Sequence, residues 1–237
     1  MRKLIALFAV TFSVCGYCDV ESQTVNNYHR IYIEPDYSWN VERTYEVENY
    51  LHVEKGQYYG LNAGYEFLKP NDFYAGIEGS ASLGNQVIGI YVDNYPQFKS
   101  IAYKNRVEGR FGYCLKANHF SLTPFSGGGG YFLVQGRHYS NFAYIPIGIK
   151  AEYQMNQLSL GIKTEQMHFV YYWNSYFEKK SYSVWKSGLY GYEVSLPIVF
   201  KSETPGGKWH SAVEPYYLKM YNDIIFVGGR FSVMHEF

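Results

Sequence analysis

The feature that most constrains the fold of this chain is the run IAYKNRVEGRFGYCL, residues 101–115, in which apolar and charged side chains alternate. Side chains of a β-strand point alternately to its two faces, so the run predicts a strand with one apolar and one charged face. The apolar face holds Ile101, Tyr103, Val107, Phe111, Tyr113 and Leu115, and the charged face holds Lys104, Arg106, Glu108 and Arg110. The alternation alone does not decide which of the two faces is turned inward.

Nine further segments read as strands of similar length, and several show the same alternation. The ten expected strands are 43–53, 57–68, 73–83, 101–115, 119–133, 140–154, 157–168, 186–201, 208–220 and 224–237. Strands of about 9–11 residues are long enough to cross a bilayer when tilted. The even number places both ends of the sheet on one side of a membrane, although eight or twelve strands also fit the pattern. Residues 54–57 are expected to form a short outer turn, and the last strand is expected to close the barrel by pairing with 43–53.

The links between these strands alternate in length. Short turns are expected at 69–72, 116–119, 154–157 and 204–207, and longer links at 85–98, 134–140 and 165–186. An antiparallel meander with short turns at one end and long loops at the other is typical of outer-membrane β-barrels. The sequence therefore predicts an all-β fold, an antiparallel up-and-down transmembrane barrel of ten strands, over residues 41–237.

The N-terminal segment resembles a cleavable export signal. Arg2 and Lys3 precede an apolar run that ends near Val14, and this run is too short for a membrane-spanning helix. We expect a signal peptide at 1–18 and a periplasmic arm, or an extra edge piece of the sheet, at 19–40. Lipidation at Cys15 or Cys18 is an alternative. Cleavage after Cys18 leaves Cys114 as the single cysteine, so no intramolecular disulfide is expected.

Composition excludes several classes of function. The whole chain has 21 basic and 21 acidic residues, and loss of Arg2 and Lys3 gives a mature charge of −2. Such a chain has no electrostatic basis for binding nucleic acid. The aromatic fraction of 20% argues against disorder, and the mean hydropathy of −0.28 argues against a bundle of membrane helices. A soluble barrel or sandwich, with the apolar faces turned inward, stays open as an alternative.

In a barrel, the charged faces of these strands would line the lumen. The side chains expected there are Glu66, Glu78, Lys104, Arg106, Glu108, Arg110, Lys150, Glu152, Glu193, Glu214 and Arg230. They either form a network that fills the lumen or line a narrow channel for small solutes. Small barrels are largely filled by side chains, and unpaired buried charges are costly. We therefore favour a mostly occluded lumen.

Several motifs resemble those of the small outer-membrane β-barrel proteins of Gram-negative bacteria, the OmpA- and OmpX-type or porin-like barrels. They are LTPFSGGGGYFL (122–133), YIPIGIKAEY (144–153), GYEVSLPIVF (191–200), VEPYYLKM (213–220) and GLNAGYEF (60–67). The resemblance implies a location in the outer membrane, contact with its lipid and lipopolysaccharide, and recognition of the last strand by the outer-membrane assembly machinery. The residues matching that assembly signal are Phe231, Val233, His235 and Phe237, although His235 stands where these barrels more often carry Tyr or an aliphatic residue.

Catalysis is not expected. His138 and His168 lie near the predicted outer ends of strands, with Ser140, Ser175 and Glu165 nearby in sequence, but they form no recognisable motif. No Cys and His spacing suggests a metal site. The run Gly127–Gly130 lacks the Lys and Ser or Thr of a phosphate-binding loop, so no cofactor is expected. Its glycines are interpreted as leaving room for bulky neighbours and as permitting a bulge or bend in the wall.

The aromatic segment 165–186 gives a further alternative. Its Tyr171, Tyr172, Trp173, Tyr176, Phe177 and Trp185 form a candidate surface for a host or other surface ligand. Equally, the strands on either side could extend beyond the membrane and pair there. The sequence thus predicts an envelope-structural or surface protein, with a narrow channel and an adhesin as the alternatives.

Overall fold

The computed structural model describes residues 28–47, 50–91, 98–135, 138–176, 182–184, 189–204, 207–220 and 224–237. The expected signal peptide, the possible lipidation sites and the first part of the expected arm lie outside the described residues. The described strands are β1 (Tyr28–Val47), β2 (Tyr50–Leu68), β3 (Asp72–Tyr91), β4 (Phe98–Ala117), β5 (Phe120–Gln135), β6 (His138–Gln154), β7 (Leu158–Tyr176), β8 (Tyr182–Val184), β9 (Leu189–Ser195), β10 (Ile198–Thr204), β11 (Gly207–Lys219) and β12 (Ile225–Glu236).

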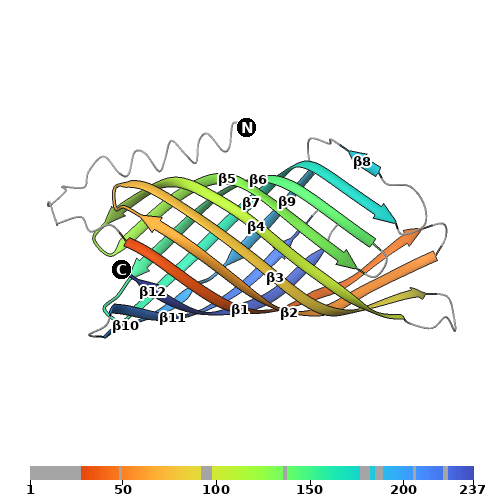
Figure 1. The fold of residues 1–237 in the computed structure, drawn as a ribbon, viewed down its shortest axis with the longest axis horizontal. Helices are drawn as coiled ribbons and strands as arrows, with labels where there is room; N and C mark the ends of the chain where they lie inside the picture. Colours follow the sequence, from red (N-terminus) through yellow and green to blue (C-terminus); the bar gives the residue numbers. More distant parts are fainter. Residues whose placement is uncertain are drawn as a thin grey trace.

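The strands form a closed antiparallel barrel. Consecutive strands pair from β1 to β7, β11 pairs with β12, and β12 pairs with β1 to close the sheet. β9 and β10 together occupy one position between β7 and β11, separated by Leu196 and Pro197. β8 pairs only with the end of β7, which leaves ten strands in the wall, as predicted. Figure 1 shows these strands crossing the barrel wall obliquely.

The first strand differs from the prediction. β1 begins at Tyr28, and residues 43–53 form the far end of the β1–β2 hairpin instead of a strand of their own. The expected turn at 54–57 lies inside β2. The last strand pairs with residues 30–40, for example Ile33 with Val233, and not with 43–53. Residues 28–40, expected in a periplasmic arm, therefore belong to the barrel.

Strand β1 contains a proline, Pro35. Proline has no N–H to donate, so a proline within a run of alternating residues argues against a strand. The pairing of β1 with β12 reaches Ile33 and resumes at Asp36 in the same register, so the strand passes through the proline. On its other side, Pro35 is paired with Leu61 of β2.

The apolar faces of the strands are turned outward. Ile33, Leu61, Val107 and Phe231 expose between 51% and 62% of their surface, whereas Glu108 and Glu193 are completely buried or nearly so. A soluble barrel or sandwich would have the opposite arrangement. An apolar exterior around a closed sheet, in which neighbouring strands satisfy the backbone, is the arrangement that lipid requires. Across the described part of the chain, no helix has the length and apolar character of a membrane span.

Candidate functional site

The two ends of the barrel differ. One end carries the turns at 69–71, 118–119 and 155–157, together with Phe237, and is named the turn end; the other is the loop end. Asp72 at the turn end pairs with Lys69 and accepts a 2.8 Å hydrogen bond from the Phe73 N–H. These two interactions hold the pKa of the Asp72 carboxyl below its usual value. The barrel interior between the two ends is divided into layers.

Halfway along the barrel, charged side chains from opposite walls meet in an ionic layer. Its members are Asp36, Glu78, Lys104, Arg106, Glu108, Arg110, Glu165, Glu193 and Arg230. At its centre the guanidinium of Arg106, 4% exposed, contacts three carboxylates. Its Nη2 lies 2.5 Å from Glu108 and 2.7 Å from Glu165, and its Nη1 bonds Glu193. One cation thus links strands β4, β7 and β9.

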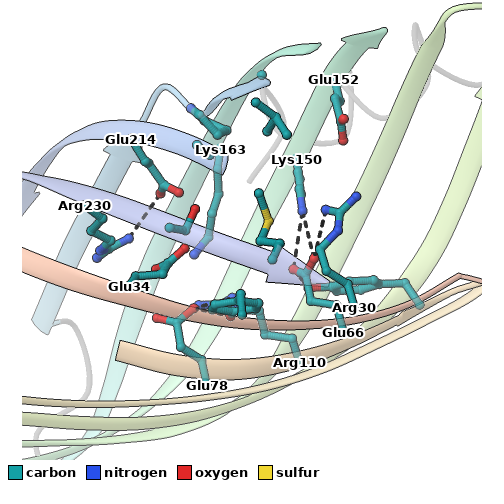
Figure 2. Close-up of a pocket in the computed structure, with 18 of the residues that line it drawn as sticks. Arg30, Glu34, Glu66, Glu78, Arg110, Lys150, Glu152, Lys163, Glu214 and Arg230 are labelled. Carbon is teal, nitrogen blue, oxygen red and sulfur yellow. Dashed lines mark hydrogen bonds and ion pairs between the residues drawn. The ribbon is translucent and has the colours of Figure 1, made fainter. Parts of the chain in front are cut away.

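Two further arginines complete the ionic layer. Arg110 bonds Glu108 and lies 3.2 Å from Glu78. Arg230 lies 3.0 Å from Glu193 and 3.1 Å from Glu214. Figure 2 shows Arg230 and Glu214 pointing toward each other, with Arg110 beside Glu78. The bonds of these two arginines join β4 to β3 and β12 to β9 and β11.

Lys104 marks the boundary of the ionic layer toward the loop end. Its ammonium donates to Asp36 at 3.3 Å and to Ser38 at 2.7 Å. The same ammonium lies 5.0 Å from the ring centre of Phe226 and 5.6 Å from that of Tyr58. Aromatic faces attract a cation at these distances, so the lysine is held by charge on one side and by rings on the other.

Beyond Lys104 the interior of the loop half is filled by an apolar layer. Its buried members are Tyr58, Ala102, Tyr131, Leu133, Phe142, Tyr144, Met167, Phe169, Leu189, Tyr216, Leu218, Met220, Ile224 and Phe226. They come from strands on all sides of the barrel, so they pack across the lumen. This layer was not predicted from the sequence, because only charged residues were assigned to the lumen.

Two backbone features shape the apolar layer. The pairing of β6 with β7 shifts between Ala143 and Tyr144, where Val170 is the extra residue of a β-bulge. The shift turns Tyr172 inward, where its ring stacks on Phe142 at 5.0 Å. A Cβ at Gly129 would lie 2.4 Å from the ring of Tyr144, so this glycine makes room for that ring, as predicted. The described pairings do not place the bulge at the glycine run.

Toward the turn end the interior opens. A cavity of about 70 Å³ lies against the ionic layer, and a chamber of about 710 Å³ lies at the turn end. Arg30, Glu66 and Glu152 line both, so the small cavity is the inner end of the chamber. Figure 2 shows Arg30 and Lys150 directed at Glu66, at ion-pair distances of 3.6 Å and 3.1 Å. The space is therefore closed on one side by the layers and open at the turn end.

Comparison with solved structures identifies the fold. The outer membrane protease OmpT from Escherichia coli matches with a TM-score of 0.56 at 13% identity, covering 91% of this chain and 98% of that one. The chain has the fold of an outer-membrane β-barrel. The transport unit of the autotransporter AIDA-I from Escherichia coli (TM-score 0.48, 11% identity, 97% of each chain) also matches. So does Ail from Yersinia pestis (TM-score 0.41, 14% identity, 90% of this chain and 99% of that one). No family model and no curated protein matches the sequence.

The eleven charges predicted for the lumen of this outer-membrane β-barrel all lie inside it. Eight are buried, and Lys150, Glu152 and Glu214 are half-buried around the small cavity. The structure adds Arg30, Glu34, Asp36 and Lys163, and gives Glu165 a place in the ionic layer. Glu34 and Asp36 could have been predicted from the sequence. In β1 they alternate with the apolar residues Ile33 and Tyr37.

The four residues of the expected assembly signal lie along the outer face of β12. Phe231, Val233 and Phe237 are 46–60% exposed. The ring of His235 stacks on Phe237 at 5.7 Å and lies 4.6 Å from Trp209. Arg230 and Ser232 face inward. Recognition of this strand by the assembly machinery stays a prediction.

Two of the residues considered for catalysis, Glu165 and His168, lie on opposite faces of the wall. Glu165 is buried in the ionic layer, whereas His168 lies on the outer face, with its ring 5.1 Å from Tyr190. The side chains of His138 and Ser175 lie outside what the structure describes, and the backbone pairing places Tyr139, between His138 and Ser140, opposite Ser175. Among the described residues, no three His, Cys, Asp or Glu side chains gather where they could hold a metal ion. Of the six aromatics of the candidate surface, Tyr171, Tyr172, Trp173 and Tyr176 belong to β7, and Phe177 and Trp185 lie outside the described residues.

Proposed function

We propose that this chain is a plugged outer-membrane β-barrel with an envelope-structural or surface role, and that it neither conducts solutes nor catalyses a reaction. The observation that carries the proposal is the filling of the interior by two consecutive layers, one ionic and one apolar. Arg106 and its three carboxylates cross the lumen first, and the rings around Tyr144 and Phe226 cross it next. Water entering from the turn end meets both layers.

The plug also supplies mechanical stiffness. Breaking a buried ion pair by moving one partner leaves an uncompensated charge in a low-dielectric space, which costs several kcal/mol, about 3–5 by substitution. Every guanidinium of the ionic layer bonds carboxylates from at least one neighbouring or facing strand. Opening the lumen would require several of these bonds to break together, so a permanent closed state is favoured.

The outer belt supports a lasting place in lipid. Its exposed side chains, such as Ile77, Val107 and Phe111, are the ones that contact acyl chains in a transmembrane barrel. On this proposal the neighbours of the protein are outer-membrane lipid and lipopolysaccharide, and the turn end faces the periplasm. Pairing of β8 with residues 172–174 of β7 favours a strand extension beyond the membrane for part of the aromatic segment. A host or surface ligand for this segment stays an alternative.

Conductance in a planar bilayer tests the proposal. The purified, heat-modifiable protein is expected to insert without steady single-channel steps in 1 M salt. Reproducible steps from folded protein, absent from a boiled sample, would overturn the plugged barrel in favour of a narrow channel. Cleavage of a mixed peptide substrate by the folded protein, again absent after boiling, would overturn the non-catalytic part.

A further inference from the structure

The chamber at the turn end has the size of a ligand site. Its volume of about 710 Å³ falls within the range of small-molecule pockets, about 300–1,000 Å³. Its lining includes Tyr28, Arg30, Lys116, Lys201, Lys208 and His210, together with three glutamates. The layers that plug the barrel do not use most of these residues, so the chamber needs its own explanation.

Two carboxylates of the chamber already have cationic partners. Glu66 lies 3.1 Å from Lys150 and 3.6 Å from Arg30. Glu236 lies 3.4 Å from Arg30 and 3.9 Å from Lys208. The third, Glu152, accepts a 2.5 Å hydrogen bond from Ser159.

Two lysines of the chamber, Lys116 and Lys201, have no carboxylate partner among the described residues. The ammonium of Lys116 lies over the ring of Tyr28, 5.5 Å from its centre, and Lys208 lies over the same ring at 6.0 Å. Lys201, half-buried on β10, forms no ion pair within 4 Å with any described side chain. The charged residues that line the chamber are the four cations Arg30, Lys116, Lys201 and Lys208 and the three anions Glu66, Glu152 and Glu236, an excess of one positive charge.

A buried histidine also lines the chamber. His210 is 5% exposed, and its Nδ1 makes no hydrogen bond to the described residues, while its Nε2 lies 3.7 Å from Glu236. A buried nitrogen without a partner costs free energy. Because this nitrogen is inaccessible to solvent, it does not contact the chamber, and the case for an anion there rests on Lys116 and Lys201.

We propose that the chamber binds the phosphate group of a small phosphorylated molecule that enters from the turn end. A phosphate monoester carries a charge of about −1.5 to −2 at neutral pH and three acceptor oxygens, which suit the two lysines that have no carboxylate partner, Lys116 and Lys201. Lysine binds phosphate as a compact point charge. Lys116 and Lys201 line the chamber from β4 and β10, and Lys208 lines it from β11. Arg30, already engaged by Glu66 and Glu236, supports the wall.

Titration of the full-length protein in detergent tests the site. The probes are inorganic phosphate and glycerol 3-phosphate, with glycerol as the uncharged control, followed by calorimetry and by ³¹P line broadening. We expect saturable binding of both phosphates and none of glycerol. Affinity should fall as the pH is lowered through about 6, where the monoester gains its second proton.

Neutral substitutions locate the site within the chamber. Lys116→Gln and Lys201→Gln remove no ion pair, so the barrel should still fold and keep its heat-modifiable mobility. Each is expected to weaken glycerol 3-phosphate binding about tenfold, a loss of about 1.4 kcal/mol. Lys69→Gln, in the exposed pair with Asp72, is the matched control and should bind as the wild type does. Absence of saturable binding, or equal weakening in the Lys69 control, would overturn the proposal.

A lipid headgroup is a second source of the same phosphate chemistry. Short-chain phosphatidic acid below its micelle concentration distinguishes the two sources. Binding of glycerol 3-phosphate that exceeds that of the lipid assigns the site to a soluble ester. Tighter, Lys116-dependent binding of the lipid assigns it to a headgroup. The conductance experiment tests the ionic and apolar layers, whereas this titration tests the chamber at the turn end. The two proposals can therefore fail independently.

Discussion

Arg106 concentrates the electrostatics of the interior in one side chain. It is almost fully buried and contacts Glu108, Glu165 and Glu193, so its removal leaves three carboxylates short of a partner. Arg106→Met is expected to lower the free energy of unfolding by at least about 3–5 kcal/mol, the cost of breaking a buried pair. Urea titration of the barrel in detergent, followed by tryptophan fluorescence, measures the change.

Two controls separate buried charge from lost packing in Arg106→Met. Lys69→Met breaks only an exposed pair and should cost about 0–1 kcal/mol. Adding Glu165→Gln to Arg106→Met should recover part of the loss, because Arg106 is the nearest cation to Glu165, whereas Glu193 keeps its pair with Arg230. A double variant no more stable than Arg106→Met would contradict the electrostatic explanation.

Adjacent glycines on β5 provide a matched test of packing. A Cβ at Gly129 would lie 2.4 Å from the ring of Tyr144, whereas a Cβ at Gly128 meets nothing within 4 Å. Gly129→Ala should therefore destabilise the barrel by about 1–3 kcal/mol through overpacking. Gly128→Ala, on the outer face, should change its stability by less than about 0.5 kcal/mol. Equal effects in urea titration would show that Tyr144 can move aside.

At the scale of the elements, closure of the barrel by β1 and β12 makes a definite cross-linking prediction. Ile33 and Val233 are direct partners on the outer face of the seam. Directly opposed residues of antiparallel strands have Cα atoms about 4.5–5.5 Å apart, within the range of a disulfide. Cysteines at both positions, in a Cys114→Ser background, are expected to cross-link on mild oxidation and to change the mobility of the unboiled barrel.

The control for this cross-link uses the strand first expected to close the barrel. Val53 belongs to β2, where it pairs with Thr44 and Gly89. Cysteines at 53 and 233 should therefore stay reduced under the same conditions. Cross-linking of this pair, and not of 33 with 233, would restore the earlier prediction that residues 43–53 meet the last strand.

The sequence predicted most of the strands because lipid and a polar lumen enforce a strict period of two. The run 101–115 shows this best, since each of its charged residues lies inside and Val107 and Phe111 lie outside. The period of two does not predict the structure correctly at two places, a proline within a strand and a β-bulge. Pro35 breaks the hydrogen-bond expectation without breaking β1, and the bulge at Val170 reverses the faces so that Tyr172 points inward.

At the scale of the whole molecule, the sequence could not predict how the interior is divided. Leu133, Met167 and Phe226 point inward, but nothing in their own strands distinguishes them from lipid-facing apolar residues. Their packing partners across the lumen come from strands that are distant in the sequence. The same limit applies to the chamber, since Lys116, Lys201 and Lys208 converge only after the sheet has closed. The sequence therefore predicts which charged residues face the lumen. It does not predict the layers and cavities, because these form only when distant strands are brought together in the closed barrel.

Closure of the barrel can be tested by the mobility of the protein on SDS gels. A transmembrane barrel whose ten strands are joined edge to edge has no free edge at which unfolding can begin, and both the ionic and apolar layers hold opposite walls together. We expect the protein to be found in the membrane fraction and to migrate differently on SDS gels with and without boiling. Arg106→Met should lower the temperature at which the unboiled band disappears, whereas Lys69→Met should not. A protein recovered from the soluble periplasm, with one mobility under both conditions, would contradict the transmembrane barrel.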